Sequence, residues 1–162
     1  MDSHKRQQGF SLIELLIVVA IIGIIAAIAI PNLLASRRAA NESSAIATMR
    51  TIFSSEATYQ STTGAGQYGD LAALGTAGLV DSVVVASGTT PKSGYGFTAL
   101  KIGTGTPFFD ATAVPSTFSG IGATGTRSFF VNESGVMYFN STAAAPTCDA
   151  TTRVVSTGAP LN

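Results

Sequence analysis

The sequence predicts an α+β fold in which the second half of a long, protruding N-terminal helix packs on a small antiparallel sheet. Two observations predict it. A stretch of roughly 50 residues, from Phe10 to Ser61, favours helix and contains only Gly23 and Pro31 as helix breakers. After Gly94, short stretches in which apolar and polar residues alternate are typical of strands. The predicted parts are a leader over residues 1–9, a helix over 10–61 and a globular head over 62–162.

The first half of the predicted helix is apolar on every side. Residues 15–30 include no polar side chain, and the run of 21 residues that starts at Phe10 is interrupted only by Ser11 and Glu14. About 20 such residues cross one bilayer as a helix. Two basic residues precede the run and two follow it, so charge favours a cytoplasmic N-terminus only weakly. Residues 10–30 must therefore stay in a membrane or pack against copies of themselves.

The second half of the predicted helix carries an apolar stripe. Its members recur at spacings of three and four residues, and no Gly or Pro occurs between Pro31 and Gly64. They are Leu34, Ala45, Met49, Ile52, Phe53 and Ala57. This half should pack on the head, while the first half protrudes. The whole helix would be roughly 75 Å long.

The head is predicted to contain one short helix and several short strands. The residues between the long helix and the strands are rich in Gly, Ala, Ser and Thr, which indicates a connecting loop. We expect Tyr95, Phe97, Ala99 and Lys101 on one face of the first long strand. The expected elements are a helix near 70–74, strands at 82–86 and 94–102, an irregular strand near 108–111, a hairpin of 127–131 and 136–139 that turns at 132–135, and a last strand at 153–156.

Composition excludes several classes of function. Nine basic residues balance nine acidic ones, so no basic field exists to hold nucleic acid, and none is predicted as a partner. Cys148 is the single cysteine and His4 the single histidine, which rules out an intrachain disulfide and a histidine-based site in the head. The chain contains no GxSxG, SxxK or phosphate-loop pattern. We predict no enzymatic activity, no metal site and no cofactor.

Glu14 is the one charge inside the apolar run, and three interpretations of the run compete. A secretory signal cut after Ala29 would be shorter and would not carry a carboxylate. A plain membrane anchor explains the length but leaves a charge that costs about 2.5–3.5 kcal/mol at the bilayer centre and less near its edge. In the third interpretation, Glu14 meets a positive charge that the encoded chain does not yet have.

The third interpretation matches a known signature. The residues "GFSLIE", from Gly9 to Glu14, follow a short basic leader and precede an apolar helix. This arrangement, close from Lys5 to roughly Arg38, resembles the class III signal of type IV prepilins and type II secretion pseudopilins. The resemblance implies the pilin fold, cleavage after Gly9 by a membrane prepilin peptidase, and N-methylation of the new terminus at Phe10.

Cleavage would supply the missing partner of Glu14. A cationic amine at Phe10 lies about one helical turn from the Glu14 carboxylate, and a neighbouring subunit could present its amine to the same carboxylate. A buried ion pair penalises any register that leaves one member unpaired by a few kcal/mol. We therefore expect Glu14 to set subunit register, and Gly23 and Pro31 to mark where the helix bends or melts in a filament.

The resemblance implies a structural function. The chain would be a subunit of a helical type IV pilus, inserted in the inner membrane with its N-terminus in the cytoplasm, then polymerised by an inner-membrane assembly platform into an extracellular fibre. One alternative is a type II secretion pseudopilin, which forms a periplasmic piston. Another is a membrane-anchored binding protein that never polymerises. Pilins of this family often close the C-terminal loop with a disulfide, which Cys148 alone cannot form.

Overall fold

The computed structural model describes residues 10–103 and 107–161. The chain divides into two compact units, and the boundary lies between Ser36 and Arg37. This boundary falls inside the long helix. The predicted division into residues 1–9, 10–61 and 62–162 places its boundaries at the two ends of that helix instead, and it stays a prediction. The leader, and Gly9 with it, lies outside the described residues.

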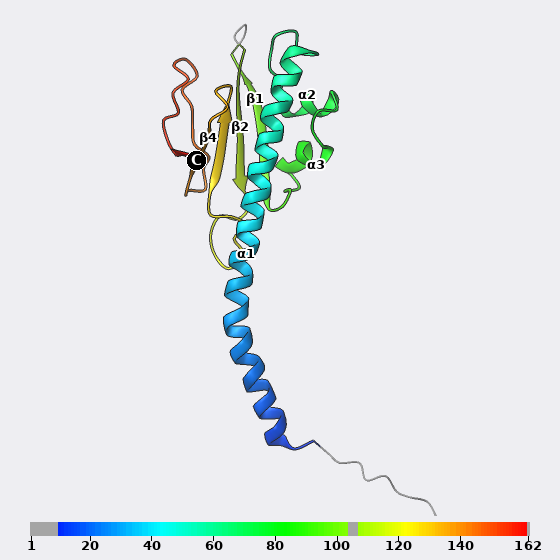
Figure 1. The fold of residues 1–162 in the computed structure, drawn as a ribbon, viewed down its shortest axis with the longest axis vertical. Helices are drawn as coiled ribbons and strands as arrows, with labels where there is room; N and C mark the ends of the chain where they lie inside the picture. The colour runs from blue at the N-terminus through cyan, green and yellow to red at the C-terminus, as the bar shows by residue number, and fades with distance from the viewer. Residues whose placement is uncertain (1–9, 104–106, 162) are drawn as a thin grey trace, which may run out of the picture. The chain divides into compact units, whose positions relative to one another are not determined.

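The long helix α1 spans Leu12–Ser61 and is 50 residues long, which confirms the predicted element almost to its ends (Figure 1). Its apolar first half gives way to a half with one buried face. The residues buried on that face are Glu42, Ala45, Thr48, Met49, Ile52, Ser55 and Glu56. Their spacing of three and four residues puts them on one side of the helix, so this side forms one wall of the core of the head.

Two short helices and a 3-10 turn connect α1 to the sheet: α2 (Leu71–Thr76), α3 (Ser82–Val85) and η1 (Ala86–Gly88). The predicted helix near residues 70–74 is confirmed as α2. The predicted strand at 82–86 is wrong, because Asp81 caps a helix there by accepting a hydrogen bond from the Val83 amide at 3.0 Å. This cap outweighs the strand preference of the three consecutive valines.

The sheet has five antiparallel strands in the order β1-β2-β3-β4-β5. They are β1 (Tyr95–Ile102), β2 (Phe108–Pro115), β3 (Ser128–Asn132), β4 (Met137–Asn140) and β5 (Ala159–Pro160). Figure 1 shows the second half of α1 beside these strands, with α2 and α3 on its other side. The first strand and the β3–β4 hairpin are confirmed within about one residue at each end.

Strand β2 corrects the predicted irregular strand near residues 108–111. It is a regular strand of eight residues that pairs with β1 along its whole length and with β3 from Asp110 to Ala113. Pro107 precedes the strand and Pro115 is its last residue, so neither proline removes a hydrogen bond from the middle of the ladder.

The core lies between the buried face of α1 and one face of the sheet. Tyr95, Phe97 and Ala99 are buried there, as predicted. Lys101, predicted on the same face, is exposed. The lysine stem can follow the apolar surface while its charged end stays in water, so alternation alone does not bury it.

The C-terminal segment also differs from the prediction. The expected strand at residues 153–156 is wrong: Val155 forms only an isolated bridge with Cys148, and the last strand is β5. Arg153 has a φ of +56°, which interrupts extended backbone, and its guanidinium instead binds Asp110 at 2.6 Å and Glu133 at 2.7 Å. These ion pairs connect the segment to β2 and to the β3–β4 turn, a connection that a single cysteine cannot supply.

Candidate functional site

The N-terminal end of α1 carries two of the predicted site residues, Phe10 and Glu14. Phe10 and Ser11 precede the helix, and the Ser11 carbonyl accepts hydrogen bonds from the amides of Glu14, at 3.1 Å, and Leu15, at 3.2 Å. Glu14 lies in the first turn, where a carboxylate interacts favourably with the positive end of the helix dipole. Ser11 and Glu14 also have the spacing of a capping box, a signal that the sequence analysis missed.

The surface around Glu14 is apolar on all sides. In the single chain Phe10 is 74% exposed and Leu12 is 80% exposed, and large apolar side chains stay exposed as far as Leu33. Glu14 is the only charged residue from Phe10 to Ser36. By length and composition α1 can cross a membrane, and the described residues contain no other helix that can. Such a surface is stable in lipid or against other copies of itself.

Gly23 and Pro31 both lie inside α1, which is continuous through them in the single chain. A methyl group added at Gly23 would meet no atom within 4 Å, so this position leaves the helix surface open to a close neighbour. Pro31 lacks the amide that would bond one turn back. The expected bend concerns the filament and stays a prediction.

A buried ion pair connects α1 to the sheet at the start of β3. The Glu42 carboxylate is 8% exposed and lies 2.8 Å from the Arg127 guanidinium, and it accepts two more hydrogen bonds from Thr126. Burial by itself raises the pKa of Glu42, but the hydrogen bonds from Thr126 and Arg127 outweigh it and lower the pKa. Glu42 lies three residues before Ala45 and so falls on the predicted apolar stripe. A carboxylate at such a position is the signal in the sequence that could have indicated a buried partner.

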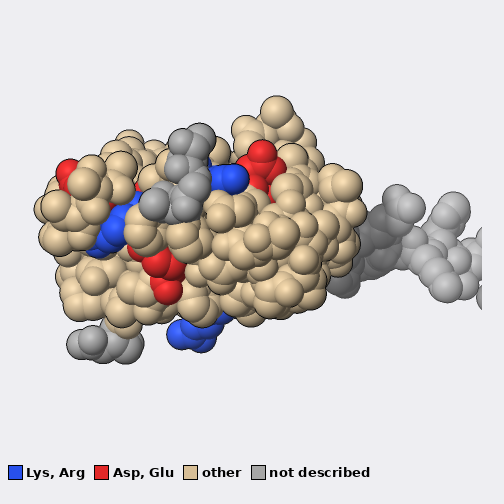
Figure 2. Space-filling view, turned by 90° about the horizontal axis from the view of Figure 1, so that it is seen from above, with Lys and Arg blue, Asp and Glu red and all other residues tan. Residues whose placement is uncertain are grey.

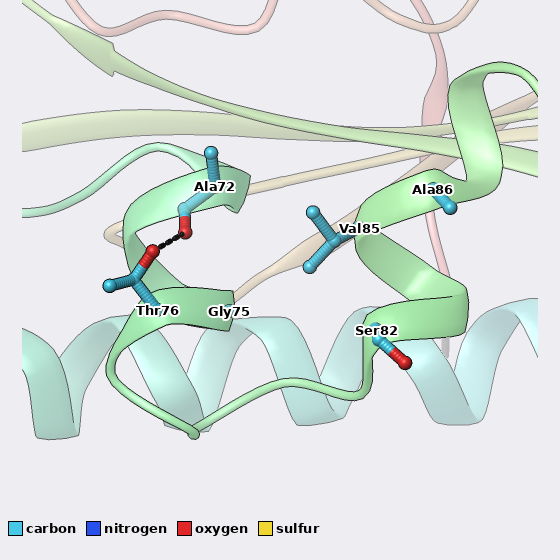
Figure 3. A pocket seen from close by; sticks show the side chains of 6 residues that line it. All are labelled: Ala72, Gly75, Thr76, Ser82, Val85 and Ala86. Carbon is cyan, nitrogen blue, oxygen red and sulfur yellow. Dashed lines mark hydrogen bonds between the residues drawn. The ribbon is translucent and has the colours of Figure 1, made fainter.

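The head also has a hollow between α2 and α3, of about 420 Å³. Figure 3 shows the Val85 side chain directed toward α2, while the Thr76 hydroxyl bonds to the Ala72 carbonyl of its own helix at 3.0 Å. The residues that line the hollow are Ala72, Gly75, Thr76, Ser82, Val85 and Ala86. It therefore offers no charged group to a ligand.

Charged side chains are sparse elsewhere on the head. Figure 2 shows a face on which a few acidic and basic residues are separated by wide uncharged areas. Within residues 10–103 and 107–161, no group of three or more His, Cys, Asp or Glu side chains has the arrangement of a metal site. The chemistry that the described residues offer is thus concentrated in α1, in its apolar surface and in Glu14.

Residues 4–30 match the family model described as "Prokaryotic N-terminal methylation motif". Over 38 residues, the chain is 63% identical to the type IV wide pilus major component PilA4 of Thermus thermophilus; this alignment covers 24% of the chain and 29% of that protein. Over 56 residues it is 43% identical to the type IV major pilin protein PilA of Myxococcus xanthus, covering 35% and 26%.

Secretion proteins match as well. Over 46 residues the chain is 39% identical to the type II secretion system core protein G of Vibrio cholerae, covering 28% of the chain and 32% of that protein. In its N-terminal part, the chain is therefore similar both to type IV pilins and to type II secretion core proteins. It spans about a third or less of the length of these curated relatives. No solved structure matches the chain.

The segment matched by the family model is the same segment that carries the exposed apolar surface and Glu14. The N-terminal methylation motif covers His4 to Ile30, which includes Phe10, Glu14 and most of the apolar surface described above. The long helix on an antiparallel sheet is the pilin α+β arrangement. Glu42 of α1 and Arg127 of the head, which pair with each other, lie outside the matched motif.

Proposed function

We propose that the chain is a structural subunit of a type IV pilus and polymerises through the first half of α1. The observation that carries the proposal is the exposed apolar surface of residues 10–33, with Glu14 as its single charge. A surface of this kind gains free energy when it packs against the same surface of other subunits. The names of the first relatives, which are major pilins, support a pilus.

The proposed maturation starts in the inner membrane, with the N-terminus in the cytoplasm. A prepilin peptidase cuts after Gly9, and the new amine at Phe10 is methylated. The amine keeps its positive charge and lies about one helical turn from Glu14. Either this amine or that of a neighbouring subunit then pairs with the Glu14 carboxylate, and an assembly platform adds the subunit to the helical filament.

The pair would fix register because leaving either charge unpaired in an apolar filament core costs a few kcal/mol. Gly23 and Pro31 are the proposed positions where α1 bends or loses helical hydrogen bonds as subunits pack. The head would remain outside the membrane and form the surface of the fibre. In this proposal the chain carries out no catalysis, and the energy for assembly comes from the platform.

A type II secretion pseudopilin is the second candidate, and the match to core protein G favours it. The two functions share the cleavage, the methylation and the role of Glu14. They differ in where the processed subunit accumulates, which is a surface fibre for a pilus and the membrane or periplasm for a secretion piston.

The test is to change Glu14→Gln, which removes the charge but keeps the shape, and to compare it with Asn32→Ala, which removes a polar group from the same segment. Sheared fibres are collected, and intact mass gives the N-terminus. We expect the unaltered chain and Asn32→Ala to start at N-methylated Phe10 in the fibres. Glu14→Gln should lower fibre yield about tenfold or more, since each 1.4 kcal/mol is a factor of ten.

Three outcomes would contradict the proposal. Fibre yield from Glu14→Gln equal to that from Asn32→Ala would remove the register role. A chain that keeps residues 1–9, or one that is cut after Ala29, would remove the processing step. A processed chain found only in the membrane and periplasm would replace the pilus with the secretion piston.

A further inference from the structure

The loop between β2 and β3 presents one apolar side chain at the end of the head where the sheet meets α1. Ile121 is 82% exposed and lies between Gly120 and Gly122. Figure 1 shows this loop, in yellow, beside α1. An isolated exposed isoleucine is common on protein surfaces and does not by itself indicate a binding site. The position of the loop and the charges around it indicate one here.

Three hydrogen-bonded contacts hold the loop against α1. The Arg38 guanidinium donates to the Gly120 carbonyl at 3.2 Å, and the Asn41 side chain donates to the Thr124 carbonyl at 2.9 Å. Glu42, one helical turn after Arg38, accepts hydrogen bonds from the amide and hydroxyl of Thr126. The loop tip therefore stays next to Arg38, and Ile121 lies one residue from the carbonyl that Arg38 binds.

The charge at this end of the head is positive. Arg37 is exposed, and within residues 10–103 and 107–161 neither Arg37 nor Arg38 forms an ion pair. Residues 116–126 of the loop contain no charged side chain. The nearby carboxylate, Glu42, is buried and paired with Arg127. Nothing acidic on the loop opposes contact with an anionic surface.

The length of chain between these arginines and the apolar run places them near a bilayer surface. Arg37 follows Ile30 by seven residues, which is about 10 Å if that stretch stays helical. The headgroup layer extends about 5–7 Å beyond each side of the hydrocarbon, and an arginine side chain reaches several more. With residues 10–30 across the bilayer, Arg37 and Arg38 come within reach of lipid phosphates.

We propose that the Gly120–Ile121–Gly122 loop tip and the two arginines form a docking surface for the headgroups of anionic phospholipids in the same membrane. The arginines bind phosphate oxygens, and Ile121 enters the boundary between headgroups and acyl chains. Each arginine near an anionic surface changes the ratio of docked to undocked heads by about fivefold. The inference rests on the proposed membrane span, and it adds a second contact that holds the head against the bilayer before assembly.

The test uses the full chain in lipid vesicles and exploits the absence of tryptophan from the sequence. Ile121→Trp places a single fluorophore at the loop tip. Val136→Trp is the matched control, because Val136 is also exposed but lies at the β3–β4 turn, at the opposite end of the sheet. The vesicles contain phosphatidylglycerol or only phosphatidylcholine, with acyl chains brominated near the headgroup to quench tryptophan on contact.

We expect quenching and a blue-shifted emission for Ile121→Trp in the anionic vesicles, and neither for Val136→Trp. Adding Arg37→Gln should lower the docked-to-undocked ratio of Ile121→Trp about fivefold. Replacing the anionic lipid with neutral lipid should lower this ratio by at least the same factor. Arg37 makes no hydrogen bond in the described structure that holds the loop, so this variant leaves the loop contacts intact.

Three results would overturn the inference, and flotation tells the first from the others. A chain that does not float with vesicles after a carbonate wash would remove the membrane span itself, and the docking with it. A chain that floats while Ile121→Trp is quenched no more than Val136→Trp would leave the span intact and remove the docking. Equal quenching in anionic and neutral vesicles, unchanged by Arg37→Gln, would remove the role of the arginines.

Discussion

Glu56 is a carboxylate in the core of the head. Its side chain is completely buried, one carboxylate oxygen accepts a hydrogen bond from the Gly69 amide at 3.0 Å, and the other has no partner among the described residues. Burial raises the pKa of Glu56 to about 7; the Gly69 hydrogen bond opposes this rise and the charge of Asp70 adds to it. Tyr68 lies in the same region, and burial followed by the charges of Glu133 and Glu56 raises its pKa.

The raised pKa makes the stability of the head depend on pH in a defined direction. Between pH about 4.5 and about 7 the folded chain binds more protons than the unfolded chain, so the free energy of unfolding falls as pH rises, by about 3 kcal/mol at most. We expect Glu56→Gln to flatten this slope, as measured by urea unfolding in detergent at pH 5, 6, 7 and 8.

Glu42→Gln is the control for that experiment. The pKa of Glu42 is lowered, so the stability it contributes is present above about pH 4.5 and is lost only in more acidic solution. Glu42→Gln should therefore lower stability by a similar amount at all four pH values and keep the slope. If Glu56→Gln retains the slope of the unaltered chain, another group is responsible for it.

At the scale of elements, the periodic spacing of apolar residues predicted helices and strands better than the strand or helix preference of single residues did. The stripe of α1 and the alternation of β1 were readable because many residues repeat the same signal. The short segments were not, because single contacts decide them. Asp81 converts three valines into helix α3, and the ion pairs of Arg153 hold the C-terminal segment away from the predicted strand. Such long-range pairs leave no local pattern in a sequence.

The residues of the candidate site divide in the same way. Phe10 and Glu14 are part of a contiguous motif and were predicted from the sequence, whereas the contacts of Glu42 with Thr126 and Arg127 join residues about 85 positions apart. A carboxylate at a stripe position signals that a partner exists. It does not say which residue the partner is.

The connection from β2 to β3 depends on one close contact between backbone and ring. The Tyr95 hydroxyl donates to the Arg127 carbonyl at 2.8 Å, and its ring is fully buried. A methyl group at Gly125 would collide with the end of this ring, whereas a methyl group at Gly122 would meet no atom within 4 Å. The two glycines belong to the same loop, which makes them a matched pair.

We expect Gly125→Ala to lower the free energy of unfolding by about 1–3 kcal/mol, because a crowded core must shift to admit the methyl group. Gly122→Ala should stay within about 0.5 kcal/mol of the unaltered chain, as open surface positions do. Urea unfolding of both variants in detergent measures the difference. Equal stabilities would mean that the loop moves to relieve the collision without loss.

At the scale of the whole molecule, the chain separates a part with a buried core from an apolar part without one. Among the described residues, none from Phe10 to Ser36 is buried, while the hydrophobic core runs from Ala45 to Met137. The fold class could be predicted because these two parts differ so strongly in composition. The apolar part contributes no residue to the core of the head.

We therefore expect residues 37–162, expressed alone, to unfold cooperatively and to remain monomeric without detergent. The full chain should associate in the same buffer and become dispersed when detergent covers its apolar helix. Size-exclusion chromatography with light scattering compares the two chains at one concentration. Aggregation of residues 37–162 would show that the head needs the first half of α1 for its own stability.

The strand order has a consequence for how the head forms. Each strand pairs with the strand made just before it, so the sheet grows from β1 to β5 by pairing neighbours in sequence, which costs less chain entropy than pairing distant segments and favours fast folding. Synthesis from the N-terminus delivers α1 first, and each strand after β1 then finds its partner already made. The edge of each strand is covered by the next strand made. This shortens the time during which another nascent chain can pair with an exposed edge.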